Sequence, residues 1–294
     1  MLRPFRYRKP FTIEETLKGL LEYGDRAKVV AGGTDLMVQM KQGLLSPQIL
    51  FDISQIGELR KIEERDDGVY IGAAATMAEI GAWFNSRAGY RALLDGVNSV
   101  GSRQVRNVGT IGGNLCNAVP SADTAPPLIA LQAELQLVGA GGGSRRIGAE
   151  QFFRGPRETI LATGELLTGI ILPPLNPRQR SRYLKLGPRN GMDLAIVGVA
   201  VSVAFNEANQ VDGVRVALGA VAPVPLRVKS IEDYLVGKHL TEETAEECGR
   251  LAQEACSPIS DLRASADYRR EMVAVLTKRA LLECVRQIEG GKAQ

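Results

Sequence analysis

A helical period of aliphatic residues is the first pattern along the chain. Between positions 13 and 21, isoleucine and leucine recur at spacings of three and four residues, as on the buried face of an amphipathic helix. Thr12 and Glu15 have the spacing of a capping box, and Gly24 is a residue type that commonly ends helices. The pattern predicts a helix over residues 12–23.

Two short apolar runs then flank a glycine-containing segment. Residues 28–31 and 49–53 are mostly β-branched, aliphatic or aromatic, which favours strands. A short helix is expected between them, over residues 35–42. A strand, a helix and a second strand in this order form a βαβ unit, which requires a parallel sheet. We expect this first subdomain to end near residue 57.

Hairpin and helix signals follow. Residues 59–64 and 69–73 flank an Asp-Gly pair, which accepts positive φ and favours a tight turn between antiparallel strands. A helix is expected to begin at Thr76, which has a glutamate three residues later. Further helices are expected over residues 90–100 and 127–132.

A second hairpin is expected from residues 134–138 and 146–147. Its glycine-rich tip fails the Gly-x-Gly-x-x-Gly pattern because Ser144 stands at the last glycine position and a strand follows. We therefore reject a Rossmann dinucleotide site. A strand over residues 166–172 ends at two prolines, and the polar, basic segment 176–182 is interpreted as an interdomain linker.

Strand-like alternation returns after this linker. Over residues 197–205, large apolar residues alternate with glycine, alanine and serine, so another element is expected to pack closely on the small face. Residues 214–218 repeat the period, and helices are expected over residues 242–255 and 268–289. A three-stranded antiparallel sheet on a helical layer is the expected result.

Together the elements predict an α+β protein of two domains. Residues 1–175 would form the first domain, with α/β subdomains over about 1–57 and 58–175, and residues 176–294 the second. A chain of 294 residues with 45% hydrophobic and 23% charged residues is long and apolar enough for such cores.

The segment 29–36, Val-Val-Ala-Gly-Gly-Thr-Asp-Leu, joins the first strand to the first short helix. Gly32 and Gly33 permit a tight turn, and Thr34 is expected to cap the helix. This order directs unpaired backbone N–H groups at one point, which suits a phosphate or pyrophosphate. An ordinary strand-to-helix turn explains the same residues, so the motif alone leaves both interpretations open.

A second paired-glycine motif is Thr110-Ile-Gly-Gly-Asn114, and Ser121-Ala-Asp123 follows it. Residues without bulky side chains let backbone approach a ligand closely. A β-bulge and a helix cap are the alternative interpretation of these residues. Two such loops within one small domain favour a shared ligand.

The net charge of +3, with acidic and basic residues intermixed, does not indicate a nucleic-acid surface or a membrane-binding face. The N-terminus has no apolar run of signal-peptide length, and no later run has the length of a membrane span. The cytoplasm is the expected location.

The sequence offers few residues for catalysis or metal binding. Four cysteines lie far apart without a Cys-x-x-Cys pair, which excludes a recognisable zinc or iron-sulfur ligand set and predicts reduced thiols. The single histidine, His239, precedes an expected helix and is predicted to face solvent, which disfavours a Ser-His-Asp site. We expect the chemistry to come from a bound cofactor.

Both glycine motifs, the Ser-Ala-Asp at 121–123 and the order of domains resemble the FAD-binding medium subunit of the molybdenum hydroxylases. This family includes carbon monoxide dehydrogenases, xanthine dehydrogenases and N-heterocycle dehydrogenases. The resemblance covers nearly the whole chain. It implies an FAD-binding domain of the vanillyl-alcohol-oxidase (PCMH-type) fold, followed by the medium subunit's C-terminal domain.

The resemblance also implies roles for individual residues. It assigns the FAD pyrophosphate to the two glycine loops: Val29, Val30, Ala31, Gly32, Gly33, Thr34, Asp35, Leu36, Thr110, Ile111, Gly112, Gly113 and Asn114. Asp123 would hydrogen-bond the FAD chain, Leu167 would pack near the isoalloxazine, and Lys185 would approach the flavin from the C-terminal domain. From pattern alone, Leu167 is a core residue and Lys185 an exposed lysine.

Two further residues are assigned by the same resemblance. Val100 stands where the family often has an aromatic residue near the adenine, and an aliphatic side chain weakens that contact. Asp193 lies in a loop that is close to the flavin and the electron acceptor in relatives; a cap before the 197–205 strand is its alternative role. The branch with an extra cysteine-ligated iron-sulfur cluster is disfavoured, because no cysteine group occurs here.

The implied function is electron transfer within a complex. Substrate would be oxidised at molybdopterin in a large subunit, and electrons would pass through iron-sulfur clusters of a small subunit to non-covalent FAD, then to NAD or another acceptor. Two copies of each of three subunits are expected. Two alternatives stay open: a self-sufficient FAD-dependent oxidoreductase acting directly on a small molecule, and a scaffold subunit without cofactor.

Overall fold

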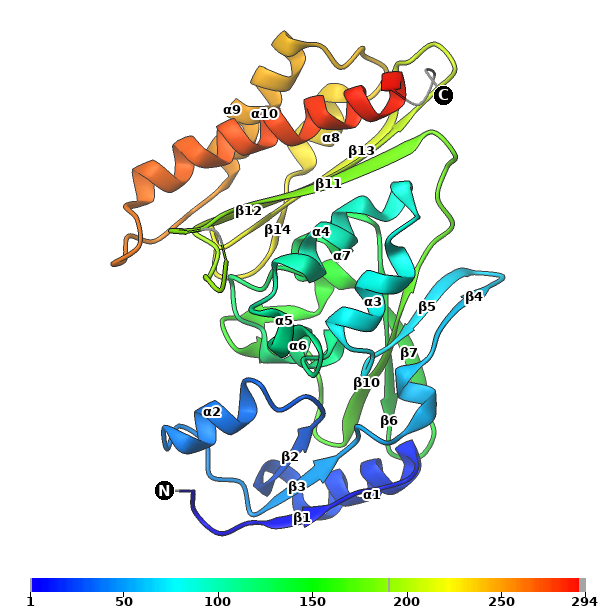
Figure 1. Cartoon of the computed structure of the whole chain (residues 1–294), viewed down its shortest axis with the longest axis vertical. Helices are drawn as coiled ribbons and strands as arrows, with labels where there is room; N and C mark the ends of the chain where they lie inside the picture. Colours follow the sequence, from blue (N-terminus) through cyan, green and yellow to red (C-terminus); the bar gives the residue numbers. More distant parts are fainter. Residues whose placement is uncertain (1, 190, 291–294) are drawn as a thin grey trace.

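The computed structural model describes residues 2–189 and 191–290, and its elements form layers stacked along the long axis of the molecule (Figure 1). The N-terminal layer is a parallel three-stranded sheet of order β1-β3-β2. Its elements are β1 (Arg6–Arg8), α1 (Ile13–Tyr23), β2 (Ala27–Val30), α2 (Leu36–Lys41) and β3 (Ile49–Asp52). The predicted βαβ unit is confirmed, as is the helix that ends at Gly24.

The middle layer contains an antiparallel sheet of order β4-β5-β10-β6-β7. Its strands are β4 (Ile62–Arg65), β5 (Gly68–Gly72), β6 (Glu134–Gly139), β7 (Ser144–Gly148) and β10 (Glu165–Leu172), with a small hairpin of β8 (Phe153–Gly155) and β9 (Glu158–Thr159). Its helices are α3 (Met77–Phe84), α4 (Arg91–Ser99), α5 (Arg103–Arg106), α6 (Ile111–Asn117) and α7 (Ala125–Ala130). Both predicted hairpins are confirmed, and so is the Thr76–Glu79 capping box.

The C-terminal layer is an antiparallel sheet of order β11-β12-β13-β14, covered by helices. Its elements are β11 (Gln179–Leu186), β12 (Val197–Phe205), β13 (Val211–Gly219), β14 (Leu226–Arg227), α8 (Lys229–Leu235), α9 (Glu242–Ala255) and α10 (Ala266–Gly290). Short 3₁₀ turns lie at Gly24–Arg26, Gly57–Arg60, Ala88–Tyr90 and Ala149–Gln151.

Three details differ from the sequence predictions. The C-terminal sheet has four strands rather than three, because β14 has only two residues and is too short to show a period. Residues 179–182 belong to β11 and are not a linker; their polar side chains concealed the strand, although Ser181 is fully buried. Thr34 does not cap α2, whose N-cap is Asp35 without a side-chain hydrogen bond.

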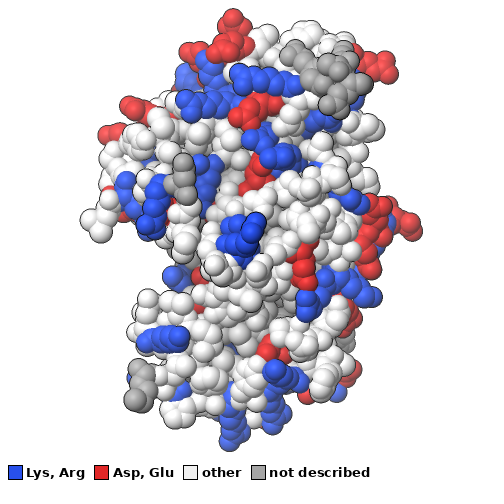
Figure 2. Space-filling model, in the orientation of Figure 1, with Lys and Arg blue, Asp and Glu red and all other residues white. Residues whose placement is uncertain are grey.

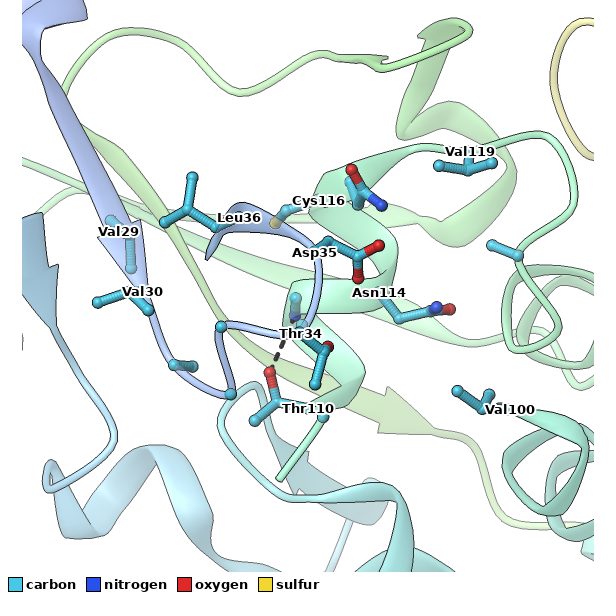
Figure 3. Close-up of a pocket in the computed structure, with 18 of the residues that line it drawn as sticks. Val29, Val30, Thr34, Asp35, Leu36, Val100, Thr110, Asn114, Cys116 and Val119 are labelled. Atoms are coloured by element: carbon cyan, nitrogen blue, oxygen red, sulfur yellow. Dashed lines mark hydrogen bonds between the residues drawn. The ribbon is translucent and has the colours of Figure 1, made fainter. Parts of the chain in front are cut away.

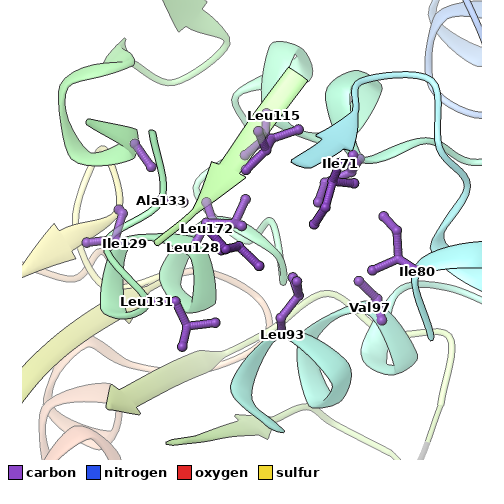
Figure 4. Close-up of a cluster of buried hydrophobic side chains, with 14 of the residues drawn as sticks. Ile71, Ile80, Leu93, Val97, Leu115, Leu128, Ile129, Leu131, Ala133 and Leu172 are labelled. Atoms are coloured by element: carbon purple, nitrogen blue, oxygen red, sulfur yellow. The ribbon is translucent and has the colours of Figure 1, made fainter. Parts of the chain in front are cut away.

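Two large hydrophobic clusters stabilise these layers. The first lies within the middle layer, where Ile71, Leu93, Leu128 and Leu172 are among the buried side chains (Figure 4). The second joins the large face of β12 and β13 to the C-terminal helices. The small face of β12 packs on α7, as the alternation predicted, and Ala200 there belongs to the first cluster.

Glycine allows the sheet and α7 to approach one another closely. A Cβ at Gly219 in β13 would lie 2.8 Å from Cγ of Pro126. Across residues 2–189 and 191–290, no helix combines the length and the apolarity that a membrane crossing requires. Lys/Arg and Asp/Glu side chains are interspersed over the face seen in Figure 2.

Candidate functional site

A cavity of about 700 Å³ lies where the N-terminal sheet, the middle layer and a loop of the C-terminal domain meet. This volume falls in the range of small-molecule and cofactor sites. Its walls include the loop from β2 to α2, residues of α6, the start of β10 and residues 192–194, which precede β12. The cavity therefore draws its lining from all three layers.

The first glycine loop supplies backbone donors. The amides of Gly32, Gly33, Thr34 and Asp35 have no intramolecular hydrogen bond among the described residues. Gly33 has φ +68°, a conformation that favours glycine, so the turn exists because this side chain is absent. Unpaired backbone N–H groups beside a cavity are suited to phosphate oxygens.

Backbone segments pack closely at both glycine loops. A Cβ at Gly32 would lie 1.9 Å from the carbonyl oxygen of Val108, and one at Gly112 would lie 2.6 Å from that of Ala73. Figure 3 shows Thr34 and Asp35 of the first loop beside α6 of the second. Glycine is thus required at both positions for close approach of backbone to backbone.

The amides of the second loop are already used. Ile111 N donates to Ala75 O at 3.1 Å and Gly112 N to Ala73 O at 2.9 Å. Gly113 N donates to Oγ1 of Thr110 at 3.2 Å, the N-cap bond drawn in Figure 3. The second loop therefore contributes shape and the Asn114 side chain, whereas the first contributes the unpaired N–H groups.

A buried polar cluster lies behind one wall. Asp123 is 6% exposed and accepts hydrogen bonds from Tyr183 Oη at 2.8 Å and from Lys185 Nζ at 2.7 Å. Burial raises the pKa of Asp123, and Lys185 and Tyr183 oppose that effect. Lys185 Nζ also donates to Ser99 O at 3.1 Å, so its ammonium group is held by protein atoms.

Two further carboxylates of the cavity differ in their partners. Asp193 pairs with Arg189 at 2.9 Å, and its Oδ2 is buried without a hydrogen-bond partner among the described residues. Burial raises the pKa of Asp35, while Arg157, Asn117 and Thr34 act to lower it. Figure 3 shows the Asp35 carboxylate beside α6.

The cavity brings together most of the residues that the sequence predicted. Those lining it are Val29, Val30, Ala31, Gly32, Gly33, Thr34, Asp35, Leu36, Val100, Thr110, Gly112, Gly113, Asn114, Asp123, Leu167 and Asp193. Two predicted residues do not line it. Ile111 is fully buried in the core, because it lies on the packed side of α6, and Lys185 lies behind Asp123.

Other lining residues were not predicted. They include Lys28, Gln39, Cys116, Asn117, Arg157 and Met192. Cys116 and Asn117 follow the second motif on the same short helix, α6. Extending the predicted motif to the end of that helix would have included them. The Cys116 side chain is exposed to the cavity itself. The protein around the cavity nevertheless desolvates its thiol and raises the pKa of that thiol to about 12. His239 is exposed, as predicted.

The cavity suits a dinucleotide. Its donor-rich end lies at the first glycine loop, and Val100, Leu166 and Leu167 provide apolar surface elsewhere in the lining. This combination matches a ligand with a diphosphate and a flat apolar ring system. No group of three or more His, Cys, Asp or Glu side chains suited to a metal ion occurs in the part of the chain that the structure describes.

Comparison with known proteins also indicates a dinucleotide ligand, FAD. Residues 3–175 match the model of the FAD binding domain in molybdopterin dehydrogenase, and residues 182–284 match the CO dehydrogenase flavoprotein C-terminal domain. The glyceraldehyde dehydrogenase medium chain of Sulfolobus acidocaldarius is 33% identical, with 95% of this chain and 98% of that protein covered.

Carbon monoxide dehydrogenases are similar in both sequence and structure. The medium chain from Hydrogenophaga pseudoflava is 35% identical, with 94% of this chain and 96% of that protein covered. A chain of the reconstituted CO dehydrogenase from Oligotropha carboxidovorans superposes with a TM-score of 0.90 at 30% identity, with 96% of this chain and 97% of that chain covered. The chain therefore belongs to the family of FAD-binding medium subunits of the molybdenum hydroxylases, and its cofactor is FAD.

Proposed function

We propose that this chain holds one FAD in the cavity and is the electron-exit subunit of a molybdenum hydroxylase complex. The observation that carries the proposal is the position of the cavity, which both glycine loops and the C-terminal domain line together. The diphosphate lies against the unpaired amides of the first loop, the adenine near Val100 and the isoalloxazine near Leu167.

Bound FAD supplies the redox chemistry, because a flavin accepts electrons singly and releases them in pairs. The chain supplies binding, orientation and local charge. Asp123 borders the cavity with both carboxylate oxygens already hydrogen-bonded, so its position is fixed before the cofactor binds. Asp193 contributes a buried oxygen that can accept a hydrogen bond from the ring system.

The partners follow from the relatives. The medium chains of carbon monoxide dehydrogenase and glyceraldehyde dehydrogenase align with this chain over 96% and 98% of their own length. We therefore assign this chain a molybdopterin-containing large subunit, a small iron-sulfur subunit, a complex with two copies of each, and a cytoplasmic location. We propose NAD as the acceptor, reaching the flavin past Asp193 and the exposed Met192, which border the cavity.

The FAD content of the purified chain tests the placement of the cofactor. Gly33→Asp should lower FAD affinity at least tenfold, because aspartate strains the turn at φ +68° and repels a diphosphate. Gly43→Asp is the matched control, since Gly43 has φ +76° but does not line the cavity. Equal FAD content in Gly33→Asp and wild type would show that the first loop does not hold the cofactor.

Anaerobic titration with NADH tests the electron acceptor. Reduction of the bound flavin by NADH, read from its visible absorbance, is the expected result. A flavin that NADH does not reduce, but that a quinone or oxygen reoxidises after reduction with dithionite, would replace NAD by that acceptor. Oxidation of an organic substrate by the isolated chain would instead show a self-sufficient oxidoreductase.

A further inference from the structure

Arg157 occupies an unusual position in the cavity wall. It lies in the β8–β9 hairpin and lines the cavity. Its backbone has φ +63°, a conformation that residues other than glycine rarely adopt. Its amide donates to the carbonyl oxygen of Ala118 at 2.8 Å, and Ala118, at the end of α6, has φ +46°. Two residues with strained backbone conformations are therefore hydrogen-bonded to each other beside the cavity. Backbone strain of this kind is concentrated at functional sites.

The Arg157 side chain belongs to a polar bridge between the two glycine-loop helices. Its Nη1 donates to Oδ1 of Asn117 at 3.5 Å, and the same oxygen accepts from Nε2 of Gln39 at 3.0 Å. Gln39 lies on α2, after the first glycine loop, and Asn117 lies on α6, after the second. The bridge thus places a guanidinium group near both loops.

The charges around the cavity leave this guanidinium available. Of the four lining carboxylates, three have a cation of their own: Asp123 pairs with Lys185, Glu165 with Arg145 and Asp193 with Arg189. The fourth, Asp35, is near enough to Arg157 to feel its charge. Within the described residues Arg157 itself forms no ion pair, and its contact with Asn117 is long and uses one of five N–H donors.

A cation beside the glycine loops would stabilise a bound diphosphate. Neither glycine loop contains lysine or arginine, and Asp35 adds a negative charge beside the first loop. Lys28 and Arg157 are the cationic residues in the cavity lining that the structure describes, and Lys28 lies on β2 before the loop. A guanidinium forms two parallel hydrogen bonds to phosphate oxygens, which an ammonium cannot.

Given the proposed FAD site, we propose that the Arg157 guanidinium binds the FAD diphosphate, held in position by Asn117 and by the strained β8–β9 hairpin. It neutralises negative charge of the diphosphate, for which the glycine loops themselves supply no cation. It also offsets the repulsion between the diphosphate and Asp35. Arg157 therefore favours a flavin that carries a diphosphate over one without phosphate.

The test compares FAD with riboflavin, which lacks phosphate. Full-length chain is freed of FAD, and the Kd of each flavin is measured from the quenching of its fluorescence. Arg157→Gln should raise the Kd for FAD roughly 10- to 100-fold and leave that for riboflavin unchanged. Arg157→Lys should recover part of the loss. Arg154→Gln is the matched control, because Arg154 lies on β8, is exposed and does not line the cavity.

A second variant separates binding from folding. Arg157→Gly relieves the positive φ, so the apoprotein should melt no lower than wild type while its Kd for FAD rises as in Arg157→Gln. Added NaCl should weaken FAD binding less in Arg157→Gln than in wild type, because a screened ion pair has been removed.

Specific outcomes overturn the inference. Arg157→Gln that binds FAD as tightly as wild type, equal losses in Arg154→Gln, or a loss found only in Lys28→Gln would each exclude Arg157 as the diphosphate cation. A Kd for riboflavin that rises as much as that for FAD would also exclude it. In all four cases wild type still binds FAD, so the proposed function stands. Wild type that binds no FAD overturns both.

Discussion

Tyr7 joins the outer strand of the N-terminal sheet to its central strand through a side chain. Its hydroxyl donates to Asp52, which is 8% exposed. Burial acts to raise the pKa of Asp52, but hydrogen bonds from Tyr7 and Ser54 and the charge of Lys9 outweigh burial and hold that pKa below its ordinary value. Because the folded state lowers the pKa of Asp52, the ionised carboxylate stabilises the fold at pH values above its ordinary pKa. This stabilisation is lost as pH falls through the lowered pKa.

We therefore expect Tyr7→Phe to lower the free energy of unfolding at pH 7 by about 0.5–1 kcal/mol, a small value because Tyr7 is half exposed. Below about pH 4 the difference should shrink, since protonated Asp52 no longer provides a charged acceptor. Urea unfolding at pH 7 and pH 3 measures both. Tyr268→Phe, at an exposed position of α10, is the control; an effect of equal size there, or a pH-independent effect of Tyr7→Phe, would contradict the prediction.

Single residues were predicted well where backbone conformation determines their type. Gly33 needs positive φ, and that requirement is visible in a strand-glycine-helix sequence. The contacts of Lys185 were not predictable, because Asp123 is 62 positions away and the alternation of β11 was concealed by polar side chains. Arg157 was missed for the same reason: its neighbours Asn117 and Gln39 are distant in sequence.

At the scale of elements, α6 depends on its N-cap. Thr110 accepts a hydrogen bond from Gly113 N, and α6 forms one side of the cavity. Loss of an N-cap hydroxyl costs roughly 1 kcal/mol. Thr110→Ala should therefore lower the free energy of unfolding by about this amount and also weaken FAD binding, because the cap positions the second glycine loop.

Thr241→Ala is the matched control for the cap. Thr241 caps α9 through Thr244 N at 3.3 Å, in the C-terminal helical layer. A similar loss of stability without a change in the Kd for FAD is expected, measured by thermal unfolding and by flavin fluorescence. If both variants bind FAD equally, the cap of α6 has no role in the cavity.

Elements with a clear period and caps were predicted correctly. The capping box at Thr76 and the helix Glu242–Ala255 were visible as local patterns. Two strands of the C-terminal sheet were not. β14 has two residues, and β11 presents Gln179, Arg180 and Arg182 before Tyr183, so burial of alternate residues such as Ser181 could be seen only once the domains were in contact.

At the scale of the whole molecule, β11 fastens the C-terminal domain to the middle layer. Ser181 Oγ accepts from Ala92 N at 3.0 Å and donates to Gly89 O at 2.7 Å, both near α4. Arg227 pairs with Glu150 across the same boundary at 3.0 Å. The sequence predicted two domains but not these contacts, because each joins residues far apart in the chain. The cavity wall around Asp123 therefore depends on contacts from both domains.

The Asp123–Lys185 pair is the most buried of these contacts between charged groups, with side chains 8% and 14% exposed. Removing one partner of such a pair leaves an uncompensated charge and costs about 3 kcal/mol. We therefore expect Lys185→Met to lower the free energy of unfolding by about that amount near neutral pH, and to weaken FAD binding, since Asp123 lines the cavity.

The pH dependence of this variant identifies the cause. The folded pKa of Asp123 is already raised by burial, and loss of Lys185 raises it further. When a carboxyl has a higher pKa folded than unfolded, stability falls as pH rises between the two values, because the folded state binds more protons. Urea unfolding should therefore show a smaller deficit for Lys185→Met at pH 5 than at pH 8. Asp123→Asn in the same variant should remove this pH dependence and recover part of the stability, because no buried charge is then left unpaired. A deficit that is independent of pH, or that Asp123→Asn enlarges, would contradict a role of Lys185 as the charge that compensates buried Asp123.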